Sequence, residues 1–321
     1  DLFPWKKYPE IGKHRGRLTE EELRTVIDYG SRLGIEVLPS RELSGHMEHI
    51  LSLPDFQDLS EWHRPADGCL DLSSQKAKDF AYGLLEEVVE FFPSRYIHIG
   101  GDETWALGRG RSLNKTWSFR GPELYESHHR NLVEIVKRNG KEPVLWGDMI
   151  SGMHLKDEGR RWSEVMGSEI WKEVLVANWD YSSKPGEYFV DKIRIFKDRA
   201  IRQIVSPGLS NWNRYYPNFQ TALENFRSFL EAARQEEVVG FMVTAWGDDG
   251  EECLFSFLDP LLLAAMEIAE GDGEWERKWI AVSGEDEEVL RVRTLLGDPD
   301  ISDALKHVVF RDLWFQRLSP E

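Results

Sequence analysis

Two adjacent carboxylates, Asp102 and Glu103, are the side chains in this sequence best placed for acid–base chemistry. They follow the apolar run Tyr96–Ile99 and two glycines, Gly100 and Gly101. The apolar run predicts a short buried strand that ends at the glycines. Neighbouring side chains of a regular strand point to opposite faces, but glycine frees the backbone from that constraint. We therefore expect both acids to face one cavity, where one can donate a proton while the other stabilises charge.

A bare Asp-Glu pair also has a structural interpretation, because acidic residues often cap the helix that follows a strand. The longer string, with His98 two residues before the glycines, is much less common than the pair alone. Adjacent carboxylates disfavour double ionisation, so one of the two pKa values should rise and that group should serve as the acid. The catalytic interpretation is therefore preferred.

The composition excludes several classes of protein. The 321 residues are enough for one large domain or two small ones. Hydrophobic residues make up 41% of the chain, and its 13 tryptophans suit both a core and sugar stacking. A formal charge of −17 argues against a nucleic-acid or anionic-membrane partner. The two cysteines imply no disulfide framework, and no apolar run approaches the ~20 residues that span a bilayer. We expect a cytoplasmic protein.

Helix-like and strand-like segments alternate along the chain. Apolar spacing and end signals predict helices at residues 19–33, 73–92, 122–137, 189–198, 219–234 and 252–270. Short apolar runs predict strands at residues 35–39, 96–99, 143–146, 174–179, 201–205 and 239–246. The alternation predicts parallel strands joined by right-handed helical crossovers. From residue 271 the chain is charged and helical in pattern, and we expect its helices to be anchored through Trp275, Trp279 and Trp314.

The string from His98 to Glu103 resembles the His-x-Gly-Gly-Asp-Glu signature of glycoside hydrolase family 20, the β-N-acetylhexosaminidases. The continuation Thr104–Gly108 and the earlier run Gly45–Glu48 look most like the hexosaminidase D branch. The resemblance implies an α/β fold, a (β/α)8 TIM barrel, with the acid pair at the end of the fourth strand. It covers roughly residues 1–270, so we expect a catalytic barrel over 1–270 and a helical C-terminal extension over 271–321, packed on the barrel.

The first residues, Asp1–Trp5, are similar to the segment that leaves the second barrel strand in this family. On that alignment the first strand and most of the second are absent from the sequence, and the predicted strands are the later ones of the barrel. A barrel incomplete at its N-terminus would expose two sheet edges. The basic residue that the family places on the first strand to hold sugar hydroxyls would be absent too.

Tryptophans and acids recur at the carboxyl ends of the predicted strands, which is where such barrels carry their chemistry. Carbohydrate sites have this makeup, because sugar faces stack on indoles while carboxylates accept from hydroxyls. Any one of these tryptophans is as often core as binding, so the recurrence is what indicates a sugar site. The resemblance implies substrate-binding roles for His46, His98, Trp105, Trp146, Trp179, Tyr181, Trp212, Trp246 and Asp248.

The resemblance also implies a reaction in which the substrate's own 2-acetamido group is the nucleophile. Glu103 matches the general acid that later activates water, and Asp102 matches the carboxylate that holds the acetamido N–H and stabilises the oxazolinium ion. His98 is expected to hydrogen-bond the pair. The implied substrate is an amino-sugar glycoside with terminal β-linked N-acetylgalactosamine or N-acetylglucosamine, and no metal or cofactor is implied. The sequence leaves open whether the chain forms a homodimer.

Individual positions have more specific implied roles. The family's indoles that wall the acetamido pocket and the sugar face are matched by Trp146, Trp179 and Trp246. Tyr181 is the candidate donor to the acetamido carbonyl, with Trp212 as the alternative occupant of that loop. Two positions depart from the family: Asp248 stands where it usually has Glu, and Glu42 where this branch has Gln and the wider family Asp.

Two other classes stay open at this point. A metal-dependent barrel hydrolase would use as ligands His46, His98, Asp102 and Glu103, although no spacing in the sequence marks a zinc site. A non-catalytic carbohydrate-binding barrel is favoured by the incomplete N-terminus and by the departures at Glu42 and Asp248.

Overall fold

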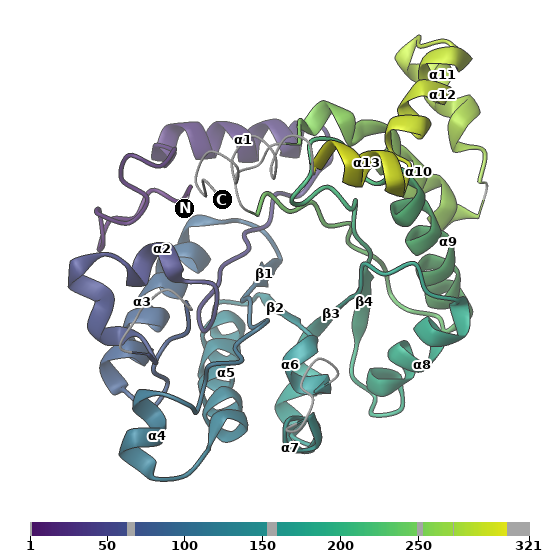
Figure 1. Cartoon of the computed structure of the whole chain (residues 1–321). Helices are drawn as coiled ribbons and strands as arrows, with labels where there is room; N and C mark the ends of the chain where they lie inside the picture. The colour runs from purple at the N-terminus through teal and green to yellow at the C-terminus, as the bar shows by residue number, and fades with distance from the viewer. Residues whose placement is uncertain (1, 63–67, 153–158, 249–252, 272, 307–321) are drawn as a thin grey trace, which may run out of the picture. The chain divides into compact units, whose positions relative to one another are not determined.

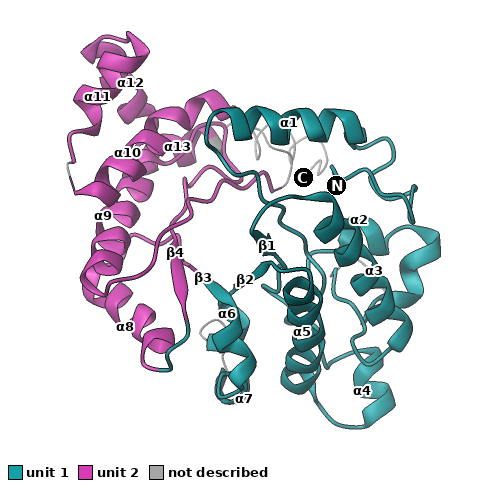
Figure 2. Ribbon diagram, turned by 180° about the vertical axis from the view of Figure 1, so that it is seen from behind, with its two compact units in different colours: residues 1–176, 199–201 teal, residues 177–198, 202–321 magenta. Residues whose placement is uncertain are grey.

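The computed structural model describes residues 2–62, 68–152, 159–248, 253–271 and 273–306 (Figure 1). The chain divides into two compact units (Figure 2). Unit 1 consists of Asp1–Val176 with Arg199–Ile201, and unit 2 of Ala177–Asp198 with Arg202–Glu321. The boundary between the units falls inside a strand, and the expected domain division at residue 270 stays a prediction.

A sheet of short strands leads into the acid pair. Its order follows the chain: β1 (Tyr96–His98), β2 (Glu142–Trp146), β3 (Leu175–Trp179) and β4 (Gln203–Ser206). β1 and β2 are parallel, with Ile97 opposite Pro143. Ile97 and Leu145 are fully buried, as expected for strands that read as continuous apolar runs. The strands predicted at residues 96–99, 143–146, 174–179 and 201–205 are confirmed.

Unit 1 contains α1 (Glu20–Arg32), α2 (Glu48–Leu51), η1 (Pro54–Leu59), α3 (Gln75–Phe91), α4 (Arg111–Thr116), α5 (Gly121–Arg138), α6 (Asp148–Ser151), α7 (Gly159–Val165) and η3 (Glu169–Glu173). α1 begins at a capping box in which Thr19 and Glu22 each bond the other's backbone N–H. α3 and α5 pack against each other, and each buries an apolar stripe that includes Leu84 on α3 and Leu132 on α5. The helices predicted at residues 19–33, 73–92 and 122–137 are confirmed.

Unit 2 contains α8 (Gly186–Lys197), α9 (Phe219–Gln235), η4 (Phe255–Phe257), α10 (Asp259–Glu270), α11 (Trp275–Ser283), α12 (Glu287–Leu296) and α13 (Pro299–Lys306). α9 packs against both α8 and α10, and Phe189 stacks on Phe229 with 4.4 Å between ring centroids. Trp275 is buried in this core and Trp279 packs against it, which confirms their anchoring role. Trp314 lies outside the described residues.

Two predicted strands are not formed. Residues 35–39 and 239–246 lie beside the sheet through isolated parallel bridges, which pair Ser40 with His98, Phe241 with Val205, and Thr244 with Gly208. Ile35, Leu38 and Val239 are 57%, 41% and 67% exposed, so the expectation of buried strands is wrong there. An apolar run indicates burial only where other elements cover it, and each of these segments flanks an outer strand of the sheet.

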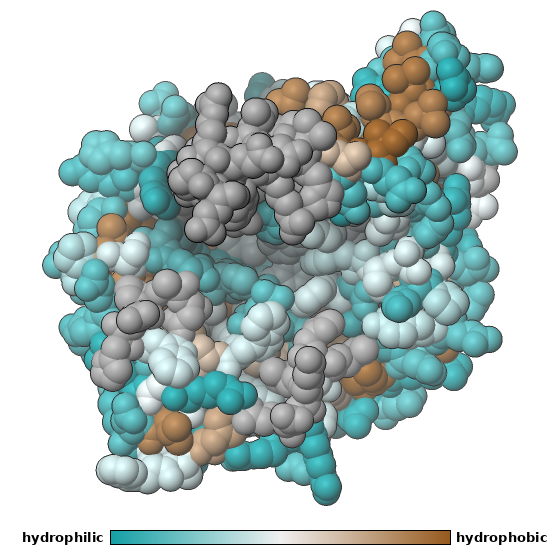
Figure 3. Space-filling view, in the orientation of Figure 1, coloured by the Kyte–Doolittle hydropathy of each residue, from teal (hydrophilic) through white to brown (hydrophobic). Residues whose placement is uncertain are grey.

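Apolar side chains gather on the surface of α11 and α12, where Figure 3 shows a brown area. They include Val282, Val289, Val292 and Leu295, which are between 43% and 72% exposed. Most of the other surface in this view is hydrophilic. Of the helices in the described ranges, none is long and apolar enough to cross a membrane.

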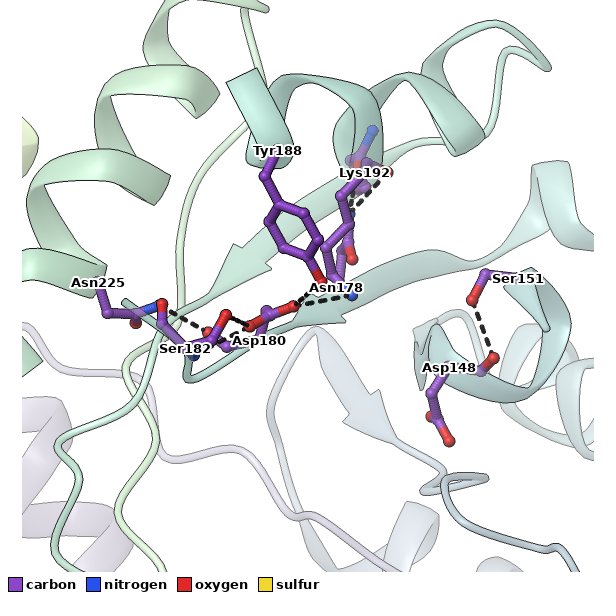
Figure 4. A network of polar contacts seen from close by, with 9 residues as sticks. Asp148, Ser151, Asn178, Asp180, Ser182, Tyr188, Lys192 and Asn225 are labelled. Atoms are coloured by element: carbon purple, nitrogen blue, oxygen red, sulfur yellow. Dashed lines mark hydrogen bonds and ion pairs between the residues drawn. The ribbon is translucent and has the colours of Figure 1, made fainter. Parts of the chain in front are cut away.

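A buried polar network fixes the loop after β3 (Figure 4). Asp180 Oδ1 accepts hydrogen bonds from Ser182 N and Oγ at 2.9 and 2.6 Å. Asp180 Oδ2 accepts from Tyr188 Oη at 2.9 Å and lies 3.6 Å from Lys192 Nζ. Burial alone would raise the pKa of Asp180, but the Lys192 charge and the bonds from Ser182 and Tyr188 outweigh it and lower the pKa. The carboxylate is therefore held in its ionised form.

Asn225, on α9, ties this loop to the one after β4. Its Nδ2 donates to the main-chain oxygens of Asp180 and Ser182 at 3.0 and 2.8 Å, and its Oδ1 accepts from Gly208 N at 3.2 Å. We call these three contacts the Asn225 clamp. Asn225 is fully buried, so the clamp satisfies main-chain groups that water cannot reach. It holds the backbone on both sides of Tyr181.

Removing the clamp is expected to destabilise unit 2. Asn225→Ala breaks all three contacts and leaves buried main-chain groups unpaired, which should lower the free energy of unfolding by about 3 kcal/mol at roughly 1 kcal/mol per bond. Urea unfolding followed by circular dichroism measures the change. Ser228→Ala on the same helix is the control, because the described part of the structure gives the Ser228 hydroxyl no hydrogen bond. Equal effects of the two substitutions would contradict the assignment.

Candidate active site

The main chain turns sharply at Gly100 and Gly101, immediately after β1. Both glycines have positive φ, +68° and +100°, where other residues are strained. A Cβ on Gly100 would collide with the Glu42 carboxyl, and one on Gly101 would lie 2.6 Å from both Leu145 Cδ1 and Tyr125 Oη. The glycines are therefore required for conformation and for space, which confirms the role expected of them.

Side chains from two neighbouring elements hold the turn and the acid that follows it. Tyr125, from α5, donates its hydroxyl to Gly101 O at 2.6 Å. Asp148, the first residue of α6, accepts the Glu103 N–H at 3.0 Å. Glu103 has a φ of +48°, and the bond to Asp148 stabilises this strained backbone. Neither Tyr125 nor Asp148 is an acid of the pair, yet both determine where the pair points.

His46 lies between the two acids. Its Nε2 is 3.4 Å from Asp102 Oδ2 and 3.5 Å from Glu103 Oε2, so both carboxylates face one imidazole. This confirms that the acids converge. Hydrogen bonding to Asp102 and then to Glu103 raises the pKa of His46 to about 11. Its Nδ1 is 4.0 Å from Glu48 Oε1. At neutral pH His46 is an imidazolium that neutralises part of the negative charge at the site.

A third carboxyl, that of Glu42, lies against the turn. Glu42 Oε2 accepts the Gly101 N–H at 3.2 Å, and the Glu42 carboxyl is close enough to Asp102 for each charge to act on the other. Burial first, and the neighbouring Asp102 charge second, raise the pKa of Glu42 well above its ordinary value. Burial and the Asp102 charge therefore both favour the protonated form of Glu42. From the sequence, Glu42 was visible only as a departure from the family pattern.

His98 supports the turn and does not bond the acids. It is 1% exposed, and its Nδ1 accepts the Gly100 N–H at 3.1 Å. Burial lowers the pKa of His98 to about 4, so the ring is neutral. The expected hydrogen bond to the acid pair is replaced by this bond to the backbone, because the ring lies under the turn. Trp146, expected to wall the substrate, is 4% exposed and packs on His98 with 4.4 Å between centroids.

Unit 2 contains a cluster of half-buried aromatic side chains, the aromatic cluster, formed by Trp179, Tyr181, Trp212 and Trp246. Tyr181 is at its centre. The Tyr181 ring stacks on Trp179 at 5.1 Å and contacts Trp212 at 5.0 Å, and its hydroxyl accepts the Trp246 Nε1–H at 3.0 Å. Gly208 makes room for Tyr181, because a Cβ there would lie 2.6 Å from Tyr181 Cδ1.

The remaining predicted residues flank these groups. In unit 1, Trp105 follows the acid pair and is 46% exposed, and Arg109 Nε donates to its main-chain oxygen at 2.9 Å. In unit 2, Asp248 is exposed two residues after Trp246, with a φ of +36°. Asn211, next to Trp212 in the loop after β4, is not among the predicted site residues; its side-chain amide bonds both main-chain groups of Trp246, at 2.8 and 3.2 Å.

The ligand set of the metal-dependent alternative is not assembled. His98 Nδ1 is the acceptor for Gly100 N–H, so His98 does not join His46 and the acids. His128 and His129, on α5, each bond a main-chain carbonyl, and their ring planes stand at 85°. Within the ranges that the structure describes, no three histidine, cysteine or acidic side chains are arranged to hold a metal ion.

A parallel α/β fold with paired carboxylates at the end of a strand occurs among glycoside hydrolases. The comparison with family models agrees. The chain belongs to glycosyl hydrolase family 20, whose catalytic-domain model matches residues 5–268. The family resemblance of the Asp-Glu signature is thereby confirmed.

Individual relatives are distant. The β-hexosaminidase subunit beta of Entamoeba histolytica is 23% identical over 294 residues, covering 84% of this chain and 51% of that protein. Hexosaminidase D of Homo sapiens is 27% identical over 192 residues, covering 57% of this chain and 37% of that protein. The crystal structure of β-N-acetylhexosaminidase from Bacteroides fragilis has a TM-score of 0.63 at 19% identity, covering 88% of this chain and 62% of that one. The chain thus spans about half or less of these curated relatives, and the structural likeness shows the fold.

The position of His46 predicts how stability depends on pH. Its pKa rises from 6.5 to about 11 on folding, so its stabilisation is complete below about pH 6.5 and is lost as the pH rises toward 11. We expect the difference in free energy of unfolding between wild type and His46→Gln to be greatest near pH 6 and to shrink between about pH 7 and pH 10. Urea unfolding over this range measures it.

The same substitution at the exposed His14 is the control, because the described part of the structure shows no ionic contact for that side chain. His14→Gln should leave the pH dependence unchanged. A His46→Gln difference that stays flat from neutral to alkaline pH would show that the imidazolium is not held by the acid pair.

Proposed function

We propose that the protein is an exo-acting β-N-acetylhexosaminidase that releases terminal β-linked N-acetylgalactosamine or N-acetylglucosamine with retention of configuration. The observation that carries the proposal is the convergence of Asp102 and Glu103 on one imidazole, held there by the glycine turn. The family membership gives the class of reaction, and the arrangement of the acids suits substrate-assisted catalysis.

In the proposed reaction Glu103 protonates the glycosidic oxygen as the leaving group departs. The substrate's acetamido oxygen attacks the anomeric carbon from the opposite face and forms an oxazolinium ion. Glu103 then takes a proton from the water that opens this ion, so two inversions give net retention. The Glu103 side chain is 32% exposed, against 13% for Asp102, which suits a group that must exchange protons with substrate and water.

Asp102 is assigned to the acetamido N–H and to the positive charge of the oxazolinium ion. Its two neighbours support this assignment, because the His46 imidazolium lies 3.4 Å from Asp102 Oδ2 and the raised pKa of Glu42 favours a protonated carboxyl that can donate to Asp102. A charged group held by fixed donors needs little rearrangement when charge develops on the substrate. Glu42 thereby performs the task of a neutral donor, as the glutamine of the hexosaminidase D branch would.

The sugar-binding role is assigned to aromatic side chains and Asp248. Half-buried indoles suit the apolar face of a pyranose ring. Within the aromatic cluster, Tyr181 is assigned to the acetamido carbonyl oxygen. Trp146 is assigned to the wall of the acetamido pocket, although only 4% of its surface is exposed. Trp105 is exposed enough to contact the group that leaves. The (β/α)8 barrel of the family is part of this proposal.

The acid assignment is tested with Glu103→Gln in the full-length protein. On an aryl β-N-acetylglucosaminide with a poor leaving group, kcat/KM should fall by roughly 10²–10⁴, because the leaving oxygen loses its proton donor. Steady-state rates measure this, and the loss should be smaller with a leaving group that needs no proton. Glu164→Gln, a change at an exposed glutamate, should retain wild-type rates.

Two further results separate the alternatives. Inhibition of wild type by an N-acetylglucosamine thiazoline, which mimics the oxazoline, would support the substrate-assisted route. Wild-type rates for Glu103→Gln with every leaving group would exclude Glu103 as the acid. Sugar binding without turnover in the wild-type protein would favour the non-catalytic carbohydrate-binding barrel instead.

A further inference from the structure

The side chain of His46 reaches the acid pair from a short segment, residues 42–46, which we call the His46 loop. His46 has a φ of +48°, a strained conformation for a residue other than glycine. A strained backbone keeps its shape only where neighbouring groups hold it. The distances of 3.4 and 3.5 Å from the His46 ring to the two acids therefore depend on the contacts of this loop.

One side of the loop is held by main-chain hydrogen bonds. Leu70 N donates to Ser44 O at 2.9 Å, and Met47 N, directly after the loop, donates to Gly68 O at 3.0 Å. Leu43 is fully buried as well, so its carbonyl needs a donor that is not water.

That donor is His128, a fully buried residue of α5. His128 Nε2 lies 3.0 Å from Leu43 O, and the two residues are 85 apart in the sequence. Burial lowers the pKa of His128 well below its ordinary value, so the ring is neutral. A carbonyl oxygen can only accept, so the single ring proton is on Nε2 and the direction of the bond is fixed. The ring stacks on Tyr82 of α3, with 5.4 Å between centroids.

The same helix also holds the glycine turn that carries the acids. Tyr125 lies three residues before His128, on the same face of α5, and donates to Gly101 O at 2.6 Å. One helix thus bonds the main chain beside the acid pair, at Gly101, and the main chain of the His46 loop, at Leu43. The helix therefore fixes the loop relative to the turn.

We propose that His128 is a positioning residue: its Nε2–H bonds the Leu43 carbonyl and holds the His46 loop so that the His46 ring lies against the acid pair. His128 is fully buried, so it acts through His46 and not on the substrate. For the reaction, the inference rests on the proposed function, since it takes the two acids as the catalytic pair. The position of the His46 ring can be measured without that assumption.

The ionisation of His46 reports where its ring lies. The charged groups that face the ring are carboxyls: Asp102 and Glu103 after β1, Glu48 at the start of α2, and Glu42 in the loop itself. Hydrogen bonds to the two acids of the pair are the largest causes of the raised pKa of His46, and such bonds weaken steeply with distance. If the loop moves away from the pair, the pKa of His46 should fall from about 11 toward its ordinary value of 6.5.

NMR titration of the protein labelled at histidine measures this in two variants. His128→Leu removes the donor, whereas His128→Gln retains one, because the glutamine amide nitrogen lies about as far from the main chain as histidine Nε2. In wild type and in His128→Gln, the His46 signal should stay that of an imidazolium up to about pH 9. In His128→Leu it should titrate below that pH. The signal is assigned by its absence from His46→Gln.

Val136→Ala is the matched control, because Val136 is a fully buried residue further along the same helix. It should destabilise the fold through lost packing and leave the His46 titration unchanged. A wild-type titration in folded His128→Leu would overturn the proposal, and so would equal losses in His128→Leu and His128→Gln. If circular dichroism shows that His128→Leu does not fold, His128→Asn takes its place, because its shorter amide does not reach Leu43 O.

Steady-state rates separate this inference from the proposed function. If wild type cleaves a β-N-acetylglucosaminide, His128→Leu should lower kcat/KM about five- to tenfold in the wild-type background and less than about twofold in His46→Gln. Equal losses in the two backgrounds would show that His128 does not act through His46. If wild type cleaves no such glycoside, the proposed function fails, and the His46 titration still decides the role of His128.

Discussion

The candidate site of unit 1 depends on a sharp turn of the main chain at two glycines with positive φ. Gly100 and Gly101 both take positive φ, and each is in contact with groups that leave no room for a Cβ. The turn lets consecutive acids face the same imidazole, which a pleated strand forbids. The strain continues into Glu103, whose left-handed backbone is accepted because Asp148 bonds its N–H. The turn at the two glycines therefore sets both the backbone conformation of this site and the direction of its two acids.

The turn is surrounded by side chains that bond its backbone. His98, Glu42 and Tyr125 contact main-chain N–H or C=O groups of the glycines. They come from β1, from the loop after residues 35–39 and from α5, so three separate segments converge on two residues. Unit 2 uses the same device, with asparagine amides bonded to main-chain groups near Tyr181 and Trp246. In both units, buried polar groups position an active side chain by holding the backbone beside it.

Much of this could be predicted from the sequence, and the limits have physical causes. The Gly-Gly-Asp-Glu string predicts the turn because positive φ is a local property of glycine. The spacing of apolar residues predicts most of the helices and strands, because that spacing is also a local property of the sequence. The strand predictions for residues 35–39 and 239–246 are wrong. Whether a segment is buried depends on the elements that cover it, and the segment's own sequence pattern does not contain that information. The raised pKa of Glu42 and the hydrogen-bond partner of His98 depend on neighbours brought together by folding. Glu42 and Gly101, for example, are 59 residues apart in the sequence.

The Asn225 clamp contacts only main-chain atoms of the residues that it holds. Every residue type presents the same carbonyl and, proline excepted, the same amide, so the clamp does not distinguish the side chains between its contacts. The path of the loop is consequently uncoupled from the identity of residue 181. An evolving chain can therefore exchange the side chain at residue 181 without losing the contacts that fix the loop beneath it.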